Sequence, residues 1–452
     1  MSISLNPNRL ARRARVGVRR RRGFYGWNVV GAMFFGMFLV LGTRQSFGVF
    51  VATWEEEWGV TTGDISIAAA IGWIINGVSQ PILGKIVDRY GGKVIVVIST
   101  IVLGVAYLLM AFIEGVLMLA VLFGGVISFF AGGVSPGTSG AVITRWFQRK
   151  RGVAMSVVAA GGSLGGLVMV PFLAQLMLAT SWQTTFIVSG IIVLALGVPV
   201  SMLILRNSPD EMGQLPDGEV RSTDKRTSAE QRSRAQALMQ GGPLGAERWT
   251  ESFKSWPMWQ LSIGYFVCGI TTASISTHFV RWAISEDISQ ADAAWAFGIL
   301  MGINAGGVIL IGLLSDYIQR HYLLALVYLV RGVAFVSLIV LPGAMAMWAF
   351  ALIGGASWLA TVPLTTGLTA DVYGVRNVGM LGGLINFSHQ MGGGAAVLLF
   401  GLTFDRWGTY DPAFAAGALW LLVAGIVILT IQEKKYSIRY APARGTATSP
   451  AT

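Results

Sequence analysis

Long apolar runs dominate the chain and alternate with short polar connections. A helix needs about 20 apolar residues to cross roughly 30 Å of hydrocarbon, because it rises about 1.5 Å per residue. Twelve runs reach this length, so the sequence predicts twelve membrane-spanning helices. Their expected ranges are 28–52, 66–87, 94–113, 116–144, 152–176, 184–205, 257–283, 292–314, 322–341, 345–369, 378–403 and 412–431.

One connection is much longer than the others and is polar. Residues 206–256 contain eight basic and eight acidic side chains and no long apolar run. This connection divides the helices into six plus six, so we expect an all-α integral membrane fold of two six-helix bundles. The expected divisions are a basic cytoplasmic tail (1–22), an N-terminal bundle (23–206), a cytoplasmic linker (207–256), a C-terminal bundle (257–432) and a cytoplasmic tail (433–452).

The placement of charge supports this topology. Only 12% of the residues are charged, against roughly 25% in soluble proteins, which excludes an ordinary water-soluble enzyme. Segment 1–22 has eight arginines and no acid, whereas the outer loop expected at 54–58 is acidic. With both termini inside, almost all basic residues lie on the cytoplasmic side, as the positive-inside rule requires. The exceptions are Arg44, Arg281, Arg331 and Arg406.

This asymmetry assigns the net charge of +11 to membrane topology and not to nucleic-acid binding. We therefore expect a multi-pass protein of the cell's inner (plasma) membrane, with both termini cytoplasmic. The lipid bilayer is a partner, and we expect a monomer.

The two halves share a motif at a constant spacing. Gly84 and Asp88, between helices 2 and 3, recur 228 residues later as Gly312 and Asp316, between helices 8 and 9. The first copy continues through two glycines to Lys93. It resembles the loop 2–3 signature of the major facilitator superfamily, and this resemblance covers nearly the whole chain.

The resemblance implies a transporter whose substrate site lies between the halves near mid-membrane. It also implies a cytoplasmic latch, in which the motif aspartate accepts hydrogen bonds from a helix N-terminus or pairs with a base across the halves. The candidate latch residues are Gly84, Asp88, Arg89, Lys93, Gly312, Asp316 and Arg320.

Further segments are similar to the signatures of a narrower branch. Residues 25–30 open helix 1, and residues 146–156 and 161–166 open helix 5. They resemble monocarboxylate transporters and their bacterial relatives of the oxalate–formate antiporter type, which implies transport of small carboxylates, often with a proton. The branch usually has a substrate-binding arginine in helix 8 and, in animal members, an aspartate a turn earlier. The aligned positions here hold Val308 and Asn304.

Ionisable side chains inside the spans are the first candidates for function, because each costs about 2.5–3.5 kcal/mol to insert. No acidic residue falls inside an apolar span away from its ends. Arg44 in helix 1, Arg331 in helix 9 and His389 in helix 11 do fall inside spans. Fixed cations with no carboxylate predict an anionic substrate.

We expect Arg44 to anchor the anion through its forked guanidinium, with Gln45 beside it. The family's helix 1 basic residue falls on one of these two positions. The alternative is a snorkelling or packing arginine near the outer interface. His389 can contact the substrate, bind the coupled proton or hydrogen-bond between helices. For Arg331 a contact with a neighbouring helix end is favoured over a functional role.

Neutral polar residues complete the candidate site, although packing or interhelical hydrogen bonds also explain each of them. They are Asn76, Asn304, Trp358, Asn386 and Gln390. His278 and Arg281, near the outer end of helix 7, are expected either to guide anions inward or to be exposed loop residues.

These features predict a secondary transporter, not an enzyme, that moves a small monocarboxylate-like anion by alternating access. Proton symport is favoured, and anion exchange and transport of a larger neutral or aromatic compound remain alternatives. A receptor is disfavoured because the tails and linker are short and polar. The single cysteine, Cys268, and the lack of a phosphate-binding Gly-Lys-Ser/Thr motif predict no metal site, no cofactor and no nucleotide-driven transport.

Overall fold

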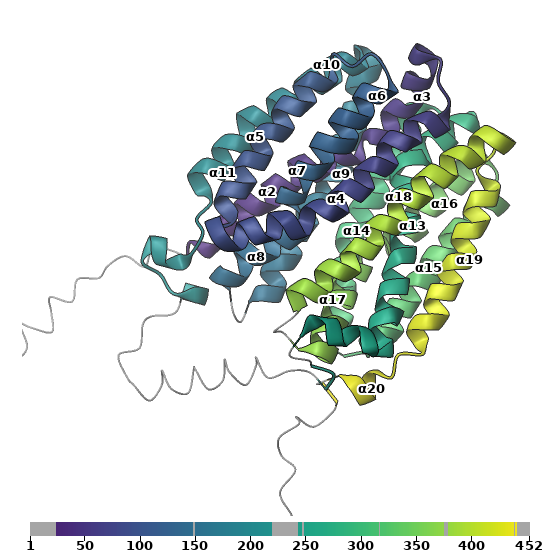
Figure 1. The fold of residues 1–452 in the computed structure, drawn as a ribbon. Helices are drawn as coiled ribbons and strands as arrows, with labels where there is room; N and C mark the ends of the chain where they lie inside the picture. The colour runs from purple at the N-terminus through teal and green to yellow at the C-terminus, as the bar shows by residue number, and fades with distance from the viewer. Residues whose placement is uncertain are drawn as a thin grey trace, which may run out of the picture.

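The structure is a computed structural model that describes residues 24–147, 150–218, 243–245, 248–315, 317–374, 378–437 and 439–440. Every regular element in these ranges is helical. The helices lie roughly alongside one another, with the earlier helices on one side and the later ones on the other (Figure 1).

The first bundle is built from six membrane-spanning segments, some of which contain short π or 3-10 turns and are therefore divided into two or more helices. Its helices are α2 (Gly26–Gln45), α3 (Phe47–Trp58), α4 (Thr62–Tyr90), α5 (Gly92–Met110), α6 (Val116–Leu119), α7 (Ser128–Ala131), α8 (Pro136–Trp146), α9 (Arg151–Ala179), α10 (Trp182–Ile192) and α11 (Val198–Ile204). Short polar side chains start several of them. Thr61 and Asp64, for example, form a reciprocal capping box at the start of α4.

The second bundle follows η6 (Trp249–Lys254), a short 3-10 helix at the end of the linker. Its helices are α13 (Trp256–Ser285), α14 (Gln290–Leu314), α15 (Arg320–Val340), α16 (Gly343–Gly355), α17 (Thr361–Tyr373), α18 (Val378–Trp407), α19 (Asp411–Leu429) and the short α20 (Glu433–Tyr436).

All twelve apolar runs correspond to helices. Among the described residues, ten helices are long and apolar enough to cross a membrane, which confirms an all-helical membrane protein. The run at 378–403 is α18, a helix of 30 residues. The run at 345–369 is not one helix, because residues 356–360 form a turn between α16 and α17. The tenth segment is therefore broken near its middle.

The expected acidic outer loop at 54–58 is helical instead, since α3 continues to Trp58. Tertiary contacts stabilise this extra turn. Trp54 is fully buried and stacks on Trp58 with ring centroids 5.5 Å apart. Glu57 accepts a hydrogen bond from the indole of Trp182 in the same bundle. The helix then ends at Gly59, whose φ of +63° suits glycine.

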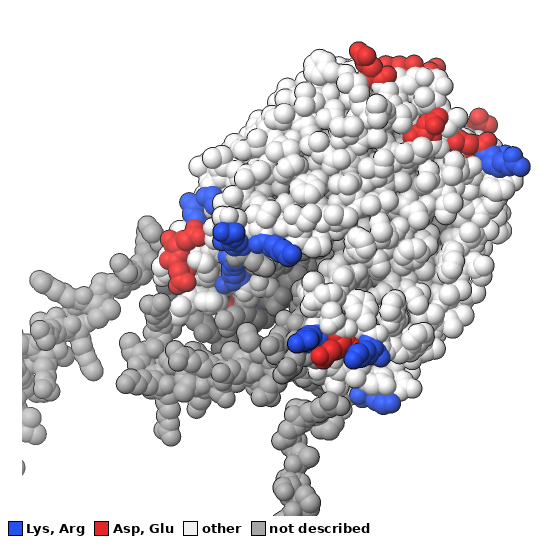
Figure 2. Space-filling view, in the orientation of Figure 1, with Lys and Arg blue, Asp and Glu red and all other residues white. Residues whose placement is uncertain are grey.

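The balance of charge differs between the two ends of the molecule, although each end carries both signs (Figure 2). Acidic residues gather near α3 and the α13–α14 connection, which we call the acidic end. Described members are Glu55, Glu56, Glu57, Asp64, Glu286, Asp287 and Asp292. Basic residues gather at the opposite end, which we call the basic end. Described members are Lys85, Arg89, Lys93, Arg145, Lys150, Arg320, Lys434 and Lys435.

The two bundles are sealed together at the acidic end. Arg281 Nε in α13 lies 2.6 Å from Glu55 Oε2 in α3. The backbone N–H of Gly63, at the start of α4, donates to Asp405 in α18 at 2.9 Å. Backbones also approach closely, since a Cβ added to Gly48 would lie 2.7 Å from the carbonyl oxygen of Thr277. We call the Arg281–Glu55 and Gly63–Asp405 contacts the acidic-end seal.

The contacts change character towards the basic end. The hydrogen bond between Asn386 in α18 and Gln80 in α4, at 2.7 Å, joins the bundles near mid-height. Closer to the basic end than this pair, the described residues of the two bundles share no hydrogen bond. Gly382 and Gly383 lie in α18 one turn nearer to the basic end than Asn386, and both have open space where a side chain would lie. Among the described residues, the bundles are thus hydrogen-bonded to each other at the acidic end and at mid-height but not at the basic end.

Candidate functional site

Arg44 is a half-buried cation in the last turn of α2, near the middle of the first membrane-spanning segment (Gly26–Trp58). Its guanidinium carbon lies 5.1 Å from the centre of the Trp73 ring in α4. Among the described residues, no hydrogen-bond acceptor and no carboxylate is within bonding distance of its nitrogens. The aromatic face stabilises the charge on one side only. Because its N–H donors have no partner among the described residues, they are available to an anion.

Trp73 is a residue that the sequence analysis did not single out. Its ring lies between two candidate anchors, because its centroid is also 6.1 Å from that of His389. It packs against Gly393 of α18, where an added Cβ would be 3.1 Å from the ring. Trp73 therefore sits at the interface of the bundles, between the cation of the first and the imidazole of the second.

His389 is held in one tautomer by its neighbours. Its Nε2 lies 3.2 Å from the hydroxyl oxygen of Thr272, and that hydroxyl donates its own hydrogen to the backbone carbonyl of Cys268 at 2.8 Å. Nε2 must therefore be the donor in the first contact. Nδ1 then carries the lone pair, and it has no hydrogen-bond partner among the described residues. The ring also packs on Tyr265, with centroids 4.9 Å apart.

Four amide side chains link α4 and α18 beside His389. Gln390 donates to Asn76 Oδ1 at 2.8 Å, Asn386 donates to Gln80 Oε1 at 2.7 Å, and Gln80 donates to Asn76 at 3.3 Å. Asn76 itself donates to the carbonyl of Ser128. These bonds leave the Oε1 of Gln390 without a donor, although Gln390 is only 6% exposed. The structure thus brings three predicted site residues, Asn76, Asn386 and Gln390, into one network.

The other neutral candidates differ in whether their polar atoms already have hydrogen-bond partners. Gln45 donates to the carbonyl of Gly162 at 3.4 Å, and its Oε1 has no partner in the described structure. Asn304 is fully buried and donates to Ser163 of the first bundle at 2.8 Å, while its oxygen accepts from the N–H of Leu359 at 2.7 Å. Asn304 is thus occupied by structural hydrogen bonds.

Arg331 contrasts with Arg44. It is fully buried, and its guanidinium donates to the backbone carbonyls of Ser357 and Trp358 in the break between α16 and α17. It makes the contact with a neighbouring helix end that the sequence analysis favoured. The Trp358 ring lies under it, 5.4 Å from the guanidinium carbon, and is only 2% exposed. Trp358 is therefore packed against Arg331 and not brought to Arg44.

The two residues near the outer end of helix 7 are neither exposed nor free. His278 is 1% exposed, and its nitrogens lie 3.2 Å from the Tyr410 hydroxyl and 2.9 Å from the carbonyl of Val397. Arg281 belongs to the acidic-end seal. The expectation of exposed loop residues was wrong because α13 continues to Ser285 and packs both positions against other helices.

The latch residues are only partly described. Asp316 and the side chain of Asp88 lie outside the described residues. Arg320 forms an ion pair with Asp371 of its own bundle, with Nη1 and Oδ2 2.6 Å apart. Arg89 lies over the ring of Tyr90, 5.2 Å from its centre.

The remaining latch positions shape the turn after α4 or face open space. The backbone N–H of Lys93 donates to the side chain of Asn207 at 2.9 Å. Gly91, with φ of +87°, leaves no room there for a side chain, because an added Cβ would lie 2.4 Å from Asn207. Gly84 and Gly312 have open space where a Cβ would be.

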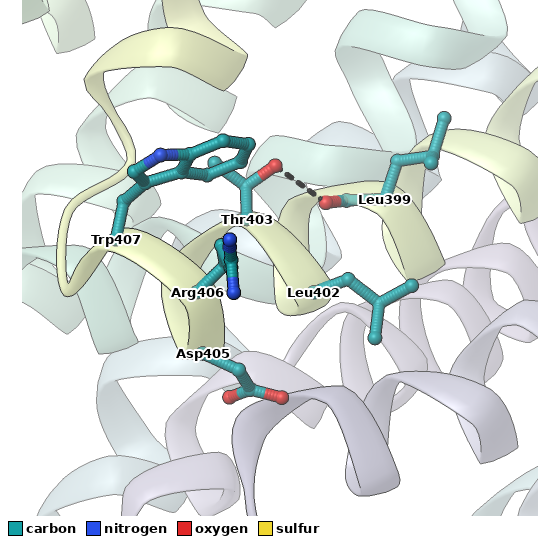
Figure 3. Close-up of a pocket in the computed structure, with 6 residues that line it drawn as sticks. All are labelled: Leu399, Leu402, Thr403, Asp405, Arg406 and Trp407. Atoms are coloured by element: carbon teal, nitrogen blue, oxygen red, sulfur yellow. Dashed lines mark hydrogen bonds between the residues drawn. The ribbon is translucent and has the colours of Figure 1, made fainter.

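A surface pocket of about 640 Å³ lies elsewhere, at the acidic end of α18 (Figure 3). It is lined by Leu399, Leu402, Thr403, Asp405, Arg406 and Trp407. Asp405 points toward α4, where it accepts the hydrogen bond from Gly63, whereas Trp407 points the other way. None of the predicted site residues lines this pocket.

The comparisons with known proteins agree with this architecture. The family model described as Major Facilitator Superfamily matches residues 33–397. An uncharacterised MFS-type transporter of Bacillus subtilis is 24% identical over 80% of this chain and 84% of its own length. A probable sulfoacetate transporter of Cupriavidus necator is 26% identical over 86% of this chain and 90% of its own length. Monocarboxylate transporter 14 of Mus musculus is 24% identical over 49% of this chain and 42% of its own length.

A solved structure shows the same fold. It is a bacterial homologue of the human lysosomal transporter Spinster in an inward-facing and occupied conformation. It superimposes with a TM-score of 0.66 and 14% sequence identity, and the match covers 94% of this chain and 99% of that chain. With the family model spanning well over half of the sequence, the chain belongs to the Major Facilitator Superfamily and is a secondary transporter, not an enzyme.

Proposed function

We propose that this transporter carries a small, monocarboxylate-like organic anion and that Arg44 is its anchor. The observation that carries the proposal is the Arg44 guanidinium, which has no anionic partner among the described residues although it lies in a span. An arginine presents its N–H donors as a planar fork that matches both oxygens of a carboxylate. The ring of Trp73 lies near this fork, 5.1 Å from the guanidinium carbon, and stabilises its charge.

Binding of an anion makes closure of the site less costly. An unpaired charge in a dry, occluded cavity loses its hydration, whereas a paired charge recovers part of that loss through attraction and hydrogen bonds. The loaded carrier therefore passes more readily than the empty one between states open to opposite sides. This difference supports alternating access.

The present arrangement supports assignment of the cycle's inward-facing state. The basic end, where the described bundles share no hydrogen bond, faces the cytoplasm by the positive-inside rule, and both termini lie on the cytoplasmic side of the plasma membrane. The acidic end faces outward and is closed by the acidic-end seal. Transport then requires the Arg281–Glu55 and Gly63–Asp405 contacts to break while the basic ends approach each other.

We propose proton symport, with His389 as a group that takes up the proton. Its Nδ1 has no hydrogen-bond partner among the described residues, so its lone pair can accept a proton. The alternative is anion exchange, in which the empty carrier cannot cross. Names of relatives are compatible with an anionic substrate: besides those above, one is a hexuronate transporter of Escherichia coli, 23% identical over 92% of this chain. They support placement of this chain near the monocarboxylate branch.

Uptake by purified protein in proteoliposomes tests this function. The probes are radiolabelled lactate, formate, oxalate and sulfoacetate, each with and without an inward proton gradient. Uptake that rises with the gradient supports symport, and uptake that depends only on anion loaded inside supports exchange. The absence of uptake for all organic anions would contradict the proposal.

A second candidate is transport of a larger aromatic compound. Trp73 and Tyr265 flank the His389 ring and could stack on an aromatic substrate. Competition separates the two candidates. Neutral aromatic compounds that block uptake better than short carboxylates favour this second candidate.

A further inference from the structure

The break at residues 356–360 lies within an apolar segment, and side chains of neighbouring helices bind its backbone groups. Arg331 in α15 donates to two of its carbonyls, and Asn304 in α14 accepts from the N–H of Leu359 at 2.7 Å. Arg331 and Asn304 are both fully buried. Backbone groups without a hydrogen-bond partner are costly inside a membrane. The shape of the break therefore depends on these two side chains.

The amide of Asn304 has only one orientation that fits both of its partners. A backbone N–H can only donate, so the atom of Asn304 that faces Leu359 is Oδ1. Its Nδ2 then faces the second partner, the hydroxyl oxygen of Ser163 in α9, and donates to it at 2.8 Å. Ser163 belongs to the first bundle and is only 2% exposed. One buried amide thus links the first bundle directly to the break in the second.

The Ser163–Asn304 contact lies where α9 and α14 begin to part. Towards the acidic end the two helices pack closely, since a Cβ added to Gly298 or Gly302 of α14 would lie 2.8 or 3.1 Å from a side chain of α9. Gly306 lies on the same face one turn nearer to the basic end, and an added Cβ there would have open space around it. A rocking motion of the bundles therefore acts directly on this contact.

The two ends of α17 are held by different groups. Its far end, at the basic end of the molecule, is joined to α15 by the ion pair between Arg320 and Asp371. Its first residue, Thr361, directly follows the break, and its hydroxyl lies 3.2 Å from the sulfur of Cys268 in α13. A change in the break therefore moves Thr361 first, and Cys268 is the side chain that this movement uncovers.

We propose that Asn304 is a positioning residue of the transport cycle, which couples the packing of the first bundle to the bend between α16 and α17. In the present state Ser163 holds the amide in the orientation that binds Leu359. When α9 moves against α14, the amide loses one of its two partners, and the break loses part of what fixes its shape. The tenth segment then bends in step with the first bundle. This role replaces the substrate contact expected for Asn304 and does not depend on the identity of the substrate.

The single cysteine of the chain is a native reporter of the break. Cys268 is 1% exposed, so N-ethylmaleimide reaches it only when neighbouring groups move away. We expect Ser163→Ala and Asn304→Leu each to raise the rate of Cys268 alkylation, followed by intact-mass spectrometry, about two- to tenfold. Ser189→Ala is the matched control and should react like the wild type, because it removes a buried hydroxyl of the first bundle that bonds only within its own helix.

Ser163→Ala distinguishes coupling from local capping, because Ser163 lies in the other bundle and contacts the break only through Asn304. Faster alkylation in Asn304→Leu alone would show that the amide merely caps the break, and this result overturns the proposal. Equal rates in all variants overturn it as well. If Ser163→Ala does not fold, the reciprocal change decides. Glu55→Gln, which loosens the bundles at the acidic end, should then raise the alkylation rate, and an unchanged rate overturns the proposal.

Uptake in proteoliposomes separates a positioning role from substrate binding. The probe is whichever of the four labelled carboxylates the wild type takes up best. We expect Ser163→Ala to lower the maximal rate at least twofold and to leave KM close to that of the wild type, because the contact acts on the conformational step. A raised KM with an unchanged maximal rate would place the contact in the substrate site and overturn the proposal. If the wild type takes up no carboxylate, the proposed function fails, whereas alkylation of Cys268 still tests the coupling.

Discussion

The guanidinium of Arg44 lies over the ring of Trp73, with the guanidinium carbon 5.1 Å from the ring centre. The two residues come from different helices, α2 and α4. The Trp73 ring also lies near the ring of His389 in the opposite bundle, with centroids 6.1 Å apart. Trp73 therefore stabilises the cation, while the N–H donors of the guanidinium make no hydrogen bond among the described residues and are available to an anion. This contact explains how an arginine without a carboxylate is retained within a span.

Replacement of Trp73 by leucine should weaken anion binding without removing it. A cation–π contact contributes about 0.5–2 kcal/mol, which corresponds to a roughly two- to thirty-fold rise in Kd. Trp73→Phe should lie between leucine and the wild type. Equilibrium binding of a labelled carboxylate measures the effect. Trp420→Leu, a change of an exposed tryptophan outside the site, is the control. Equal Kd values for all these proteins would contradict the cation–π role of Trp73.

Arg331 and Arg44 should differ in what they stabilise. Arg331→Met leaves the buried carbonyls of Ser357 and Trp358 without donors, and each unsatisfied group costs about 1–3 kcal/mol. We therefore expect a clear drop in the melting temperature of the detergent-solubilised protein. Arg44→Met removes no hydrogen bond among the described residues, so its melting temperature should stay close to that of the wild type. A larger drop in melting temperature for Arg44→Met than for Arg331→Met would contradict the assignment of a structural role to Arg331 and a functional role to Arg44.

Glu55→Gln should favour opening of the acidic end. The Glu55 and Arg281 side chains are 13% and 18% exposed, so the pair is neither fully exposed nor fully buried. Its loss should therefore shift the conformational equilibrium by roughly 1–3 kcal/mol, between the values typical of exposed and buried ion pairs. Spin labels at the exposed positions 56 and 286, in a Cys268→Ser background, report the distance across this end. Glu57→Gln is the matched control, because Glu57 bonds only within its own bundle. An unchanged distance distribution in Glu55→Gln would argue against the seal.

Acid should weaken the contact between α20 and α15. Glu433 accepts hydrogen bonds from the backbone N–H and ring Nδ1 of His321, each at 2.9 Å. Burial by itself raises the pKa of Glu433, but the hydrogen bonds from His321 outweigh burial and hold the pKa below its ordinary value of 4.5. Such a carboxyl stabilises the folded state above its unfolded pKa, and this contribution is lost as the pH falls from about 4.5 through the lower folded value.

Thermal melting across this acidic range measures the contribution of Glu433. Glu433→Gln should melt at a lower temperature than the wild type above pH 4.5, and the gap should close as the pH falls below that value. A constant gap over the whole range would show that ionisation of Glu433 does not stabilise the contact.

Most of the helical architecture could be predicted because an apolar run long enough to cross hydrocarbon has few other stable structures. The break at residues 356–360 could not be predicted in this way. Its backbone groups are satisfied by Arg331 and by Asn304, which come from α15 and α14. Only the tertiary contacts reveal that this apolar segment is two helices.

The residues of the candidate site could be predicted only in part, for a similar reason. Charged residues in apolar spans stand out, so Arg44 and His389 were found. Trp73 did not stand out, because a tryptophan in a span also occurs in packing and at interfaces. One signal was available: Trp73, Asn76 and Gln80 fall three and four residues apart, which places them on one face of a helix. The partners of His278 were not readable, since Tyr410 and Val397 are far from it in sequence.

The affinity of purified protein for a labelled carboxylate, compared between the wild type and Arg44→Gln, tests the central claim most directly. Removal of one member of a desolvated, hydrogen-bonded charge pair costs about 2–5 kcal/mol. We predict a roughly 30-fold or greater loss of affinity in Arg44→Gln, partial recovery in Arg44→Lys and an unchanged melting temperature. Binding by Arg44→Gln as tight as that of the wild type would contradict the assignment of Arg44 as the anion anchor.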